Sequence, residues 1–287
     1  MRQRGRKDAG GTAPSRRSFL AGAAAFAGAT RWPRLARPSD ELRVAVVGLN
    51  GRGAEHVDAL RALPGVRIQA LCDVDELVLL REAKRIREKG AERVDVHTDF
   101  RAVLERDDVD AVTLATPNHW HALQALWACQ AEKDVYLEKP ATHTFGEGAP
   151  LVAAARKYER IVQCGFQSRA SPALAAAIEW IRAGHLGALE LVRGICYKPR
   201  PSIGKTKGNQ KLPENVDYDL WCGPAPLTPL RRARLHYDWH WSFATGDGEL
   251  GNQGAHALDV ARWVLGTDEL PASVFSLGGR LGYDDDG

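Results

Sequence analysis

The sequence predicts an α/β fold built on a doubly wound parallel sheet. A valine-rich apolar run over residues 42–47 leads directly into a glycine-rich turn over 48–53, and a second apolar run over 66–71 is followed by Asp73. Short apolar runs of this kind are typical of parallel strands that are covered on both faces. The order of strand, glycine-rich turn, helix, strand and acidic residue is typical of a dinucleotide-binding site.

Helices and strands alternate through the rest of this half. Mixed-sign charge over 81–89 is typical of the solvated face of a helix, and Pro117 with its polar neighbours indicates the first turn of another. We therefore expect a helix from about Gly53, a helix over 76–89, a short strand over 94–96, a helix over 99–105, strands over 110–115 and 134–138, and a helix that opens within 116–121.

The turn over 48–53 departs from the usual glycine spacing, because Asn50 stands where the second glycine is expected. Glycine and asparagine both tolerate the backbone dihedrals that bring a chain close to a pyrophosphate. Asp73 ends the second strand, where a carboxylate accepts hydrogen bonds from the adenosine ribose and repels a 2′-phosphate, so we expect NAD rather than NADP. Alternatively, Asp73 or Asp75 caps the helix that follows.

Further cofactor contacts are expected where helices begin at the carboxyl ends of strands, because helix N-termini there face the cofactor crevice. His119 and His121 have the alternative of capping their helix or lying half-buried. The predicted cofactor contacts are Gly48, Asn50, Gly51, Arg52, Gly53, Asp73, Thr116, Pro117, Asn118, His121, Glu138, Lys139 and Gln167.

Lys139 directly follows the apolar and aromatic run over 134–138 and precedes Pro140. A cation at the end of a late strand in such a sheet lies where the nicotinamide ring would be. An exposed lysine beside a turn-forming proline is the simpler alternative.

Residues 1–37 are predicted to be an export signal and a linker rather than part of the fold. Arg16 and Arg17 precede an apolar run over 21–29 that ends in small residues, which is the layout of a twin-arginine signal. The run is about half of the ~20 residues that span a bilayer. We therefore expect recognition by the twin-arginine export machinery, cleavage near Ala29, a periplasmic or otherwise exported location, and no stable membrane anchor.

Charge and cysteine content exclude several classes of protein. The net charge is +3, but the first 29 residues hold six basic residues and one acidic residue, which leaves the remainder slightly acidic. Nucleic-acid binding is not expected, because it would need a clustered basic face. The five cysteines include no Cys-x-x-Cys pair and have apolar neighbours, so we expect buried thiols rather than disulfides or a zinc site.

Five motifs in one order, GLNGRG, LCDVD, ATPNHWHA, YLEKPATHT and QCGFQSR, resemble those of the Gfo/Idh/MocA oxidoreductases. The resemblance runs from about residue 42 to the C-terminus. It implies an NAD(P)-binding Rossmann domain over 42–165 and a substrate and oligomerisation domain over 166–287, which is α+β with an open antiparallel sheet. It also implies a homo-oligomer if the chain is full length. We expect strands over 187–197 and 273–277. Because family members usually continue through more strands, we expect an incomplete sheet and a truncated chain.

The resemblance also implies the catalytic residues. The family motif D-x-x-x-H matches Asn252 and His256, so the histidine is present and the aspartate is replaced. Oxidation of a secondary alcohol needs a base near neutral pH, for which His256 is the candidate, and a group such as Lys139 that hydrogen-bonds the hydroxyl. Asn252 can hydrogen-bond the substrate or the imidazole but cannot take up a proton. Asp259, three residues after His256, is a candidate to orient that ring.

Aromatic and histidine residues cluster over 236–241. His236 and His240 have the spacing of metal ligands on a helix, but the aromatic alternation between them argues against a helix, so we expect no metal. Stacking of Trp239 or Trp241 on a sugar and aromatic core packing are both open. The predicted substrate contacts are Lys139, Trp239, His240, Asn252 and His256.

Together these features predict an exported NAD-dependent oxidoreductase that acts on a secondary alcohol of a sugar, polyol or sugar derivative. Because soluble NAD is scarce outside the cytoplasm, we expect a tightly held cofactor that is oxidised and reduced within one cycle. Two alternatives use the same fold. One is an NAD-dependent glycosidase that cleaves after transient oxidation, and the other is a non-catalytic sugar- or nucleotide-binding protein, which Asn252 and the short second half favour.

Overall fold

The computed structural model describes residues 41–90, 93–267, 269–279 and 281–286. The predicted export signal therefore lies outside the described residues. Within the described part, no helix combines the length and the apolarity that crossing a bilayer requires.

The strands of the described chain are β1 (Leu42–Val47), β2 (Val66–Cys72), β3 (Asp95–His97), β4 (Ala111–Leu114), β5 (Asp134–Glu138) and β6 (Val162–Gly165). They form one sheet in the order β3-β2-β1-β4-β5-β6, and every neighbouring pair is parallel. This is the doubly wound order of a Rossmann sheet, as predicted. The direction of winding reverses between β1 and β4, which opens a crevice at the carboxyl ends of these two strands.

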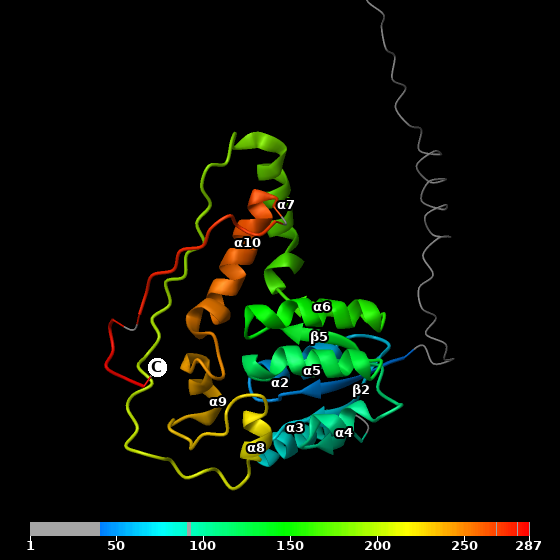
Figure 1. The fold of residues 1–287 in the computed structure, drawn as a ribbon. Coiled ribbons are helices and arrows are strands. Elements are labelled where there is room, and N and C mark those ends of the chain that lie inside the picture. The colour runs from blue at the N-terminus through cyan, green and yellow to red at the C-terminus, as the bar shows by residue number, and fades with distance from the viewer. Residues whose placement is uncertain (1–40, 91–92, 268, 280, 287) are drawn as a thin grey trace, which may run out of the picture. The chain divides into compact units, whose positions relative to one another are not determined.

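Helices cover both faces of this sheet (Figure 1). They are α2 (Arg52–Arg61), α3 (Glu76–Glu88), α4 (Phe100–Leu104), α5 (Asn118–Gln130) and α6 (Gly148–Lys157). Apolar side chains of α2 and α3 share a buried cluster with Val46 and Leu71 on one face. On the other face, α4, α5 and α6 share a larger cluster with β1, β2, β4 and β5. Burial on both faces explains why the strands are continuous apolar runs.

Carboxylates cap two of these helices. Asp75 accepts hydrogen bonds from the backbone N–H groups of Leu77 and Val78, at 2.9 and 3.1 Å, and Asp99 accepts one from Arg101 at 2.9 Å. A cap of this kind stabilises a helix by about 1 kcal/mol. Since Asp75 caps α3, Asp73 is available for another role.

The second half is built from short helices and extended segments. They are a 3-10 turn (Gln167–Ala170), α7 (Pro172–Trp180), a π-helix (Ile181–His185), α8 (Tyr218–Cys222), α9 (Leu235–Asp238), a 3-10 turn (Trp239–Trp241), a second π-helix (Leu250–Gly254) and α10 (Ala255–Leu265). Trp221, Cys222, Leu230 and Leu235 form a small core of their own. Val74, which follows β2, packs against this core, so the two halves share an apolar contact.

Residues 213–217 join the second half to the first at the end of β2. The backbone N–H of Asp217 donates to the Val74 carbonyl at 3.0 Å, and that of Glu76 donates to the Asn215 carbonyl at 2.9 Å. These bonds satisfy backbone groups that the sheet leaves unpaired. They hold the second half against the strand end that carries Asp73.

The strands predicted over 187–197 and 273–277 are wrong for the described chain. Both segments lack regular structure, and no described strand lies beside either of them. A β-strand is stable only when neighbouring strands pair with its backbone groups. Residues 187–197 instead pass against α10, where a Cβ on Gly194 would lie 2.9 Å from the Cβ of Ala257.

The prediction that residues 236–241 are not helical is also wrong. They contribute to α9 and to the 3-10 turn that follows it. The side chain of Asp238 is buried and accepts a hydrogen bond from the backbone N–H of Arg234 at 3.0 Å, while its own N–H donates to the Arg234 carbonyl at 2.9 Å. These local bonds close a helical turn, which the alternation of aromatic residues does not reveal.

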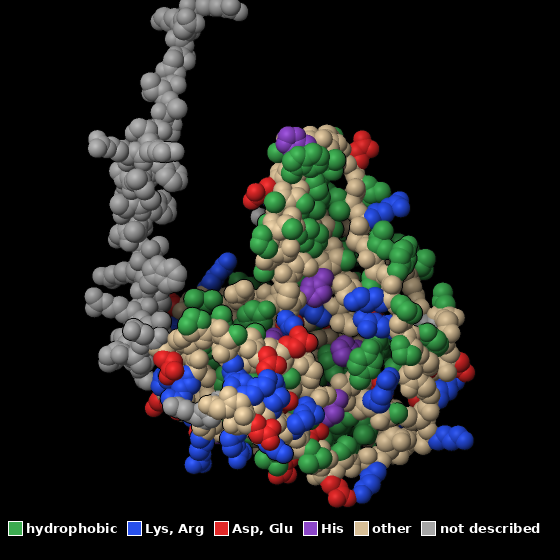
Figure 2. Space-filling model, turned by 180° about the vertical axis from the view of Figure 1, so that it is seen from behind, with side chains coloured by type: hydrophobic (Ala, Val, Ile, Leu, Met, Phe, Trp, Pro, Cys, Tyr) green, Lys and Arg blue, Asp and Glu red, His purple; other side chains and the backbone are tan. Residues whose placement is uncertain are grey.

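Apolar side chains remain exposed along α7 and the segment that follows it. Figure 2 shows them gathered over this part of the chain, where Trp180 is 51% and Leu186 is 58% exposed. Apolar patches of this kind are typical of surfaces that another protein segment covers.

The cysteines are free thiols. Cys72, Cys129 and Cys222 are buried, as predicted, whereas Cys164 and Cys196 are half-buried. Burial raises the pKa of Cys164 to about 12, so this thiol stays protonated at neutral pH.

Candidate functional site

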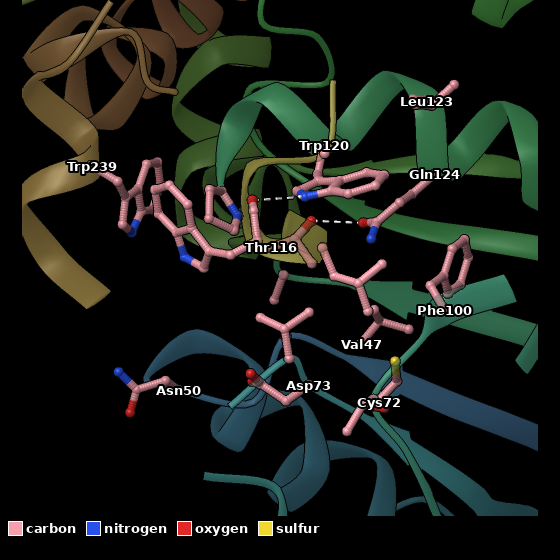
Figure 3. Close-up of a pocket in the computed structure, with 18 of the residues that line it drawn as sticks. Val47, Asn50, Cys72, Asp73, Phe100, Thr116, Trp120, Leu123, Gln124 and Trp239 are labelled. Atoms are coloured by element: carbon pink, nitrogen blue, oxygen red, sulfur yellow. Dashed lines mark hydrogen bonds between the residues drawn. The ribbon is translucent and has the colours of Figure 1, made fainter. Parts of the chain in front are cut away.

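A cavity of about 720 Å³ opens at the carboxyl ends of β1, β2 and β4. In Figure 3, Asn50 and Asp73 lie on one side of it, Thr116 and Trp120 lie opposite, and Trp239 of the second half lies at one end. Doubly wound sheets bind nucleotides in this crevice, and the volume is in the range of small-molecule sites.

The turn after β1 needs glycine at two positions. At Gly48, φ is +77° and a Cβ would lie 2.8 Å from the carbonyl carbon and oxygen of Ala115. At Gly53, a Cβ would lie 1.6 Å from the Gly48 carbonyl oxygen. The first glycine lets the turn pass against the end of β4, and the second lets α2 begin directly behind the turn.

Asp73 is a buried carboxylate on the cavity wall. Its Oδ2 accepts a hydrogen bond from the Leu49 N–H at 2.7 Å, and its Oδ1 accepts one from the Asp75 N–H at 2.9 Å. Burial raises the pKa of Asp73, although both backbone donors act to lower it. Each oxygen keeps a second acceptor position, so a fixed carboxylate remains able to accept hydrogen bonds from two hydroxyl groups.

Apolar side chains, three of them aromatic, form the wall opposite the glycine-rich turn, and sequence reasoning missed them. They are Phe100, Trp120, Leu123 and Trp127. Thr116 Oγ1 donates to Gln124 Oε1 at 2.7 Å and Trp120 Nε1 donates to the Trp221 carbonyl at 3.1 Å, which fixes this wall (Figure 3). A planar base fits between such side chains. In the sequence they look like the ordinary apolar face of a helix.

The predicted cofactor contacts divide into two groups. Those that line the cavity are Gly48, Asn50, Gly51, Arg52, Asp73, Thr116 and Pro117. Those outside its lining are Gly53, Asn118, His121, Glu138, Lys139 and Gln167.

Glu138 is the centre of a buried polar network beside the cavity. Its Oε1 accepts hydrogen bonds from Arg52 Nε at 2.8 Å, from Gln167 Nε2 at 3.1 Å and from His56 Nε2 at 3.1 Å. Burial acts to raise the pKa of Glu138, but the hydrogen bonds from His56 and Arg52 and the charge of Arg52 lower it to about 2. Since Arg52 also lines the cavity, this network connects the glycine-rich turn to the strand that ends beside Lys139.

Lys139 contacts Asn252, although 113 positions separate them in the chain. Its Nζ donates to the Asn252 backbone carbonyl at 2.8 Å and to the Asn252 side-chain Oδ1 at 3.2 Å. Burial lowers the pKa of Lys139, and the charge of Glu138 partly opposes this effect. Asparagine therefore supplies the hydrogen-bond acceptor that aspartate would supply, without the negative charge.

His256 follows Asn252 on the same helical segment. Its ring lies edge-on to Phe166, with ring centroids 5.8 Å apart, and its buried Nδ1 has no hydrogen-bond partner within the described chain. Burial lowers the pKa of His256 and the nearby charge of Lys139 lowers it further, so the ring is neutral at pH 7. Asp259, the candidate to orient this ring, instead pairs with Arg169 at 2.8 Å.

His121 lies behind the cavity wall rather than in it. Its Nδ1 is 2.6 Å from the Pro140 carbonyl and its Nε2 is 2.8 Å from the Thr116 carbonyl. Burial lowers the pKa of His121, which favours the neutral ring. A neutral ring carries one N–H, so His121 donates to one of these two carbonyls and contacts the other, between the cavity wall at Thr116 and the turn that carries Lys139.

His119 makes the corresponding link to the second half. Its Nδ1 is 3.2 Å from the Thr245 carbonyl and its Nε2 is 3.1 Å from the Trp221 carbonyl. Burial lowers its pKa as well. Sequence reasoning missed this role, because backbone carbonyl acceptors have no signature in the sequence.

His236 and His240 both line the cavity, and each has its own partner. His236 Nε2 lies 2.7 Å from Asp75 Oδ2, while His240 Nδ1 donates to the Tyr237 carbonyl at 2.7 Å and its ring stacks on Trp239 with centroids 3.6 Å apart. Within the described part of the chain, no three His, Cys, Asp or Glu side chains come together as a metal site would require. Burial lowers the pKa of His240, and the charge of Lys139 lowers it further.

Two family models match the chain, one in each half. Residues 42–166 match the NAD-binding Rossmann fold of an oxidoreductase family, and residues 191–276 match the C-terminal alpha/beta domain of the same family. The chain belongs to the Gfo/Idh/MocA oxidoreductase family. The predicted family, fold class and NAD-binding domain are thereby confirmed.

Curated relatives of this Gfo/Idh/MocA chain are named as glycosyl hydrolases. A glycosyl hydrolase family 109 protein of Shewanella sp. (strain ANA-3) is 38% identical over 125 residues, which are 42% of this chain and 27% of that relative. One from Saccharopolyspora erythraea is 37% identical over 125 residues, with the same shares of each chain. The chain thus spans about a quarter of the length of the curated relatives that it matches.

Solved structures of the family are similar over a longer stretch. GenD2 from gentamicin A biosynthesis, solved in complex with NAD, is 27% identical with a TM-score of 0.56 and covers 82% of this chain and 56% of its own. An oxidoreductase domain protein from Kribbella flavida is 26% identical with a TM-score of 0.56, over 79% of this chain and 54% of its own.

The network at Glu138 predicts a pH-dependent contribution to stability. Because its pKa falls from 4.5 to about 2 on folding, the ionised carboxylate stabilises the protein above pH 4.5, and this contribution is lost as the pH falls through 2. By linkage the contribution is about 3 kcal/mol. We expect Glu138→Gln to lower the free energy of unfolding, measured with urea, by about 3 kcal/mol at pH 7 and by less at pH 3.

Glu55→Gln is the matched control, since Glu55 also pairs with Arg52 but is 66% exposed. It should change the unfolding free energy by less than about 1 kcal/mol. Equal effects of the two substitutions at pH 7 would contradict the role of the buried network.

Proposed function

We propose that this protein is an NAD-dependent oxidoreductase that acts on a secondary alcohol of a sugar, polyol or sugar derivative. The observation that carries the proposal is the contact of Lys139 with Asn252, which lies one helical turn before His256. A lysine and a histidine that both have lowered pKa values, close together at a cleft, are typical of catalytic sites. A protein that only binds sugar or nucleotide has no need of this pair.

Asp73 supports NAD over NADP. Its carboxylate lines the cavity with both oxygens fixed by backbone donors, so it can accept hydrogen bonds from the adenosine ribose hydroxyls. A phosphate on the same ribose would meet a buried negative charge. The apolar wall around Trp120 and Leu123 suits the adenine ring.

In this proposal Lys139 and His256 divide the work at the substrate hydroxyl. The bound nicotinamide supplies the hydride acceptor. Lys139 donates a hydrogen bond to the hydroxyl oxygen, where negative charge develops, and so favours the transition state over the ground state. His256, which is neutral at pH 7, accepts the hydroxyl proton on a ring nitrogen.

Asn252 orients the lysine in this scheme. Its two carbonyl oxygens hold Lys139 Nζ in one place, which leaves one ammonium proton for the substrate. Because the amide is uncharged, it does not stabilise the lysine cation as a carboxylate would. The lowered pKa of Lys139 is compatible with a lysine that also takes part in proton transfer.

The carbohydrate class is supported by the curated relatives, which are named as glycosyl hydrolases. These names also favour a second candidate function, an NAD-dependent glycosidase that oxidises its substrate transiently before the glycosidic bond is cleaved. Both functions begin with the same oxidation at Lys139 and His256. Trp239 on the cavity wall is available to stack on a sugar face.

We further propose that residues 1–37 direct export through the twin-arginine machinery and that the cofactor is held tightly and recycled. Tight retention of the cofactor is supported by the second half of the chain, because its residues Trp221, Tyr237 and Trp239 line the cavity and close it on one side. The His236 contact with Asp75 and the backbone bonds of residues 213–217 anchor that closure. We propose a domain boundary near residue 166, between the two matched family regions.

The bound nucleotide can be identified directly. We expect mass spectrometry of the denatured, purified protein to detect NAD. Asp73→Asn removes the charge but keeps one acceptor oxygen, so it should weaken NAD binding about tenfold and improve the relative affinity for NADP. Recovery of NADP from the unaltered protein would contradict the role of Asp73, and recovery of no nucleotide would favour the non-catalytic alternative.

Substitution of Lys139 and His256 tests the catalytic pair. On a panel of sugars and polyols, Lys139→Ala and His256→Ala should each lower kcat by about 10²–10⁴, the usual contribution of general acid–base catalysis. Lys84→Ala, at an exposed lysine of α3, is the matched control and should leave kcat unchanged. Retained turnover in both active-site variants would rule out the proposed roles.

Asn252→Asp provides a separate readout in the same assays. A carboxylate beside Lys139 Nζ raises the pKa of the lysine, because it stabilises the cation. The pH profile of kcat should therefore move to higher pH. A profile unchanged by this substitution would show that Lys139 does not titrate during turnover.

Substitution of the two signal arginines tests export. The unaltered chain should be recovered outside the cytoplasm in a form cleaved near Ala29, whereas a variant with Arg16→Lys and Arg17→Lys should remain inside at full length. Cell fractionation and mass spectrometry of the N-terminus test this. Stoichiometric release of NADH by the exported protein would contradict cofactor recycling.

A further inference from the structure

A second cavity, of about 420 Å³, lies wholly in the second half of the chain. It is lined by Tyr218, Trp221, Cys222, Ala225, Pro226, Thr228, Pro229, Arg231, Arg232, Ser242, Ala244 and Thr245. Trp221 also lines the first cavity, so the two cavities share this residue. The proposed oxidoreductase reaction makes no use of this second cavity.

Arg232 brings a poorly compensated charge to the second cavity. Its Nη1 donates to the backbone carbonyl of Asp238 at 3.2 Å. Within the described residues, no carboxylate oxygen lies within 4.0 Å of its guanidinium nitrogens, so Arg232 forms no ion pair there. Burial lowers the pKa of Arg232, which means that the surrounding protein disfavours the cation. A half-buried cation of this kind is stabilised when an anion pairs with it.

The negative charge of Asp238 acts on Arg232, but the Asp238 carboxylate is paired with a different residue. Asp238 is 1% exposed, and Arg234 binds both of its oxygens, through its backbone N–H to Oδ2 at 3.0 Å and through Nη2 to Oδ1 at 2.8 Å. Within the described chain, Arg232 is hydrogen-bonded to Asp238 only through that backbone carbonyl. The remaining N–H groups of Arg232 are left for a ligand in the cavity.

The other groups around the cavity suit a small polar ligand. Arg231 adds a second positive charge to the lining, and its Nε donates only a long hydrogen bond, 3.4 Å, to Asn209 Oδ1. Tyr218 stacks on Trp221 with ring centroids 5.7 Å apart and planes 7° from parallel, which makes a flat aromatic wall. Positive charge beside a flat wall is suited to an anionic group attached to a compact organic body.

We propose that the second cavity binds the oxyanion group of a small molecule, a carboxylate, sulfate or phosphate, through the guanidinium of Arg232. The planar fork of an arginine matches two oxygens of such a group at once. This site is separate from Lys139 and His256, and it requires neither NAD nor turnover.

Isothermal titration with the purified protein tests the proposal. The probes are inorganic phosphate, inorganic sulfate and glucuronate, with glucose as the uncharged counterpart of glucuronate, in a buffer free of other oxyanions. We expect at least one of the three anions to bind with millimolar or better affinity and glucose to bind more weakly than glucuronate at this site. The anion that binds best identifies whether the ligand group is inorganic or a carboxylate.

Substitution distinguishes this cavity from other anion sites on the protein. Arg232→Gln should weaken anion binding about tenfold or more, because a charge-assisted hydrogen bond is lost. Arg87→Gln, at an exposed arginine of α3, is the matched control and should leave binding unchanged. Equal binding by the Arg232 variant, or no anion binding by the unaltered protein at millimolar concentrations, would overturn the proposal.

Chemical protection gives a readout that does not depend on the folding of a variant. Phenylglyoxal modifies arginine side chains, and peptide mass spectrometry reports each position separately. The anion that binds should slow modification of Arg232 in the unaltered protein and leave Arg87 unaffected. Equal rates at Arg232 with and without that anion would contradict the proposed contact.

Discussion

The site depends on the contacts that polar side chains at the start of α5 make with backbone carbonyls of other segments. His121 faces the carbonyls of Thr116 and Pro140, while His119 and Trp120 both reach the carbonyl of Trp221. Leaving a buried carbonyl unpaired costs about 1–3 kcal/mol, so these contacts are a strong constraint on where the segments lie. One helical turn thereby positions the cavity wall, the turn with Lys139 and the cover from the second half.

A chain of polar contacts connects the cofactor cavity to the groups that are proposed to react. Arg52 lines the cavity and binds Glu138, and Glu138 precedes Lys139, which contacts Asn252 across the boundary between the halves. The arrangement keeps charges balanced around a half-buried lysine. Asn252 supplies two acceptor oxygens to the lysine, one from its backbone and one from its side chain, and adds no negative charge.

Much of the first half could be predicted from sequence, because its rules are local. Continuous apolar runs mark strands buried on both faces, and the turn at Gly48 and Gly53 needs residues without a Cβ. The second half was harder to predict. Residues 187–197 have the composition of a strand, but a strand also needs a partner, and that requirement is not local. The turn closed by Asp238 and Arg234 depends on side-chain bonds that hydrophobic alternation does not show.

The sequence by itself determined the family, the order of the Rossmann elements and the residue types at the site, including the asparagine at position 252. These properties follow from residue spacing and from backbone conformations that only certain residues adopt. Only the tertiary structure decided that Lys139 contacts Asn252, that His121 lies behind the wall, and that Arg232 faces a second cavity. These features depend on how separate segments pack together in three dimensions, and spacing along the chain carries no record of that packing.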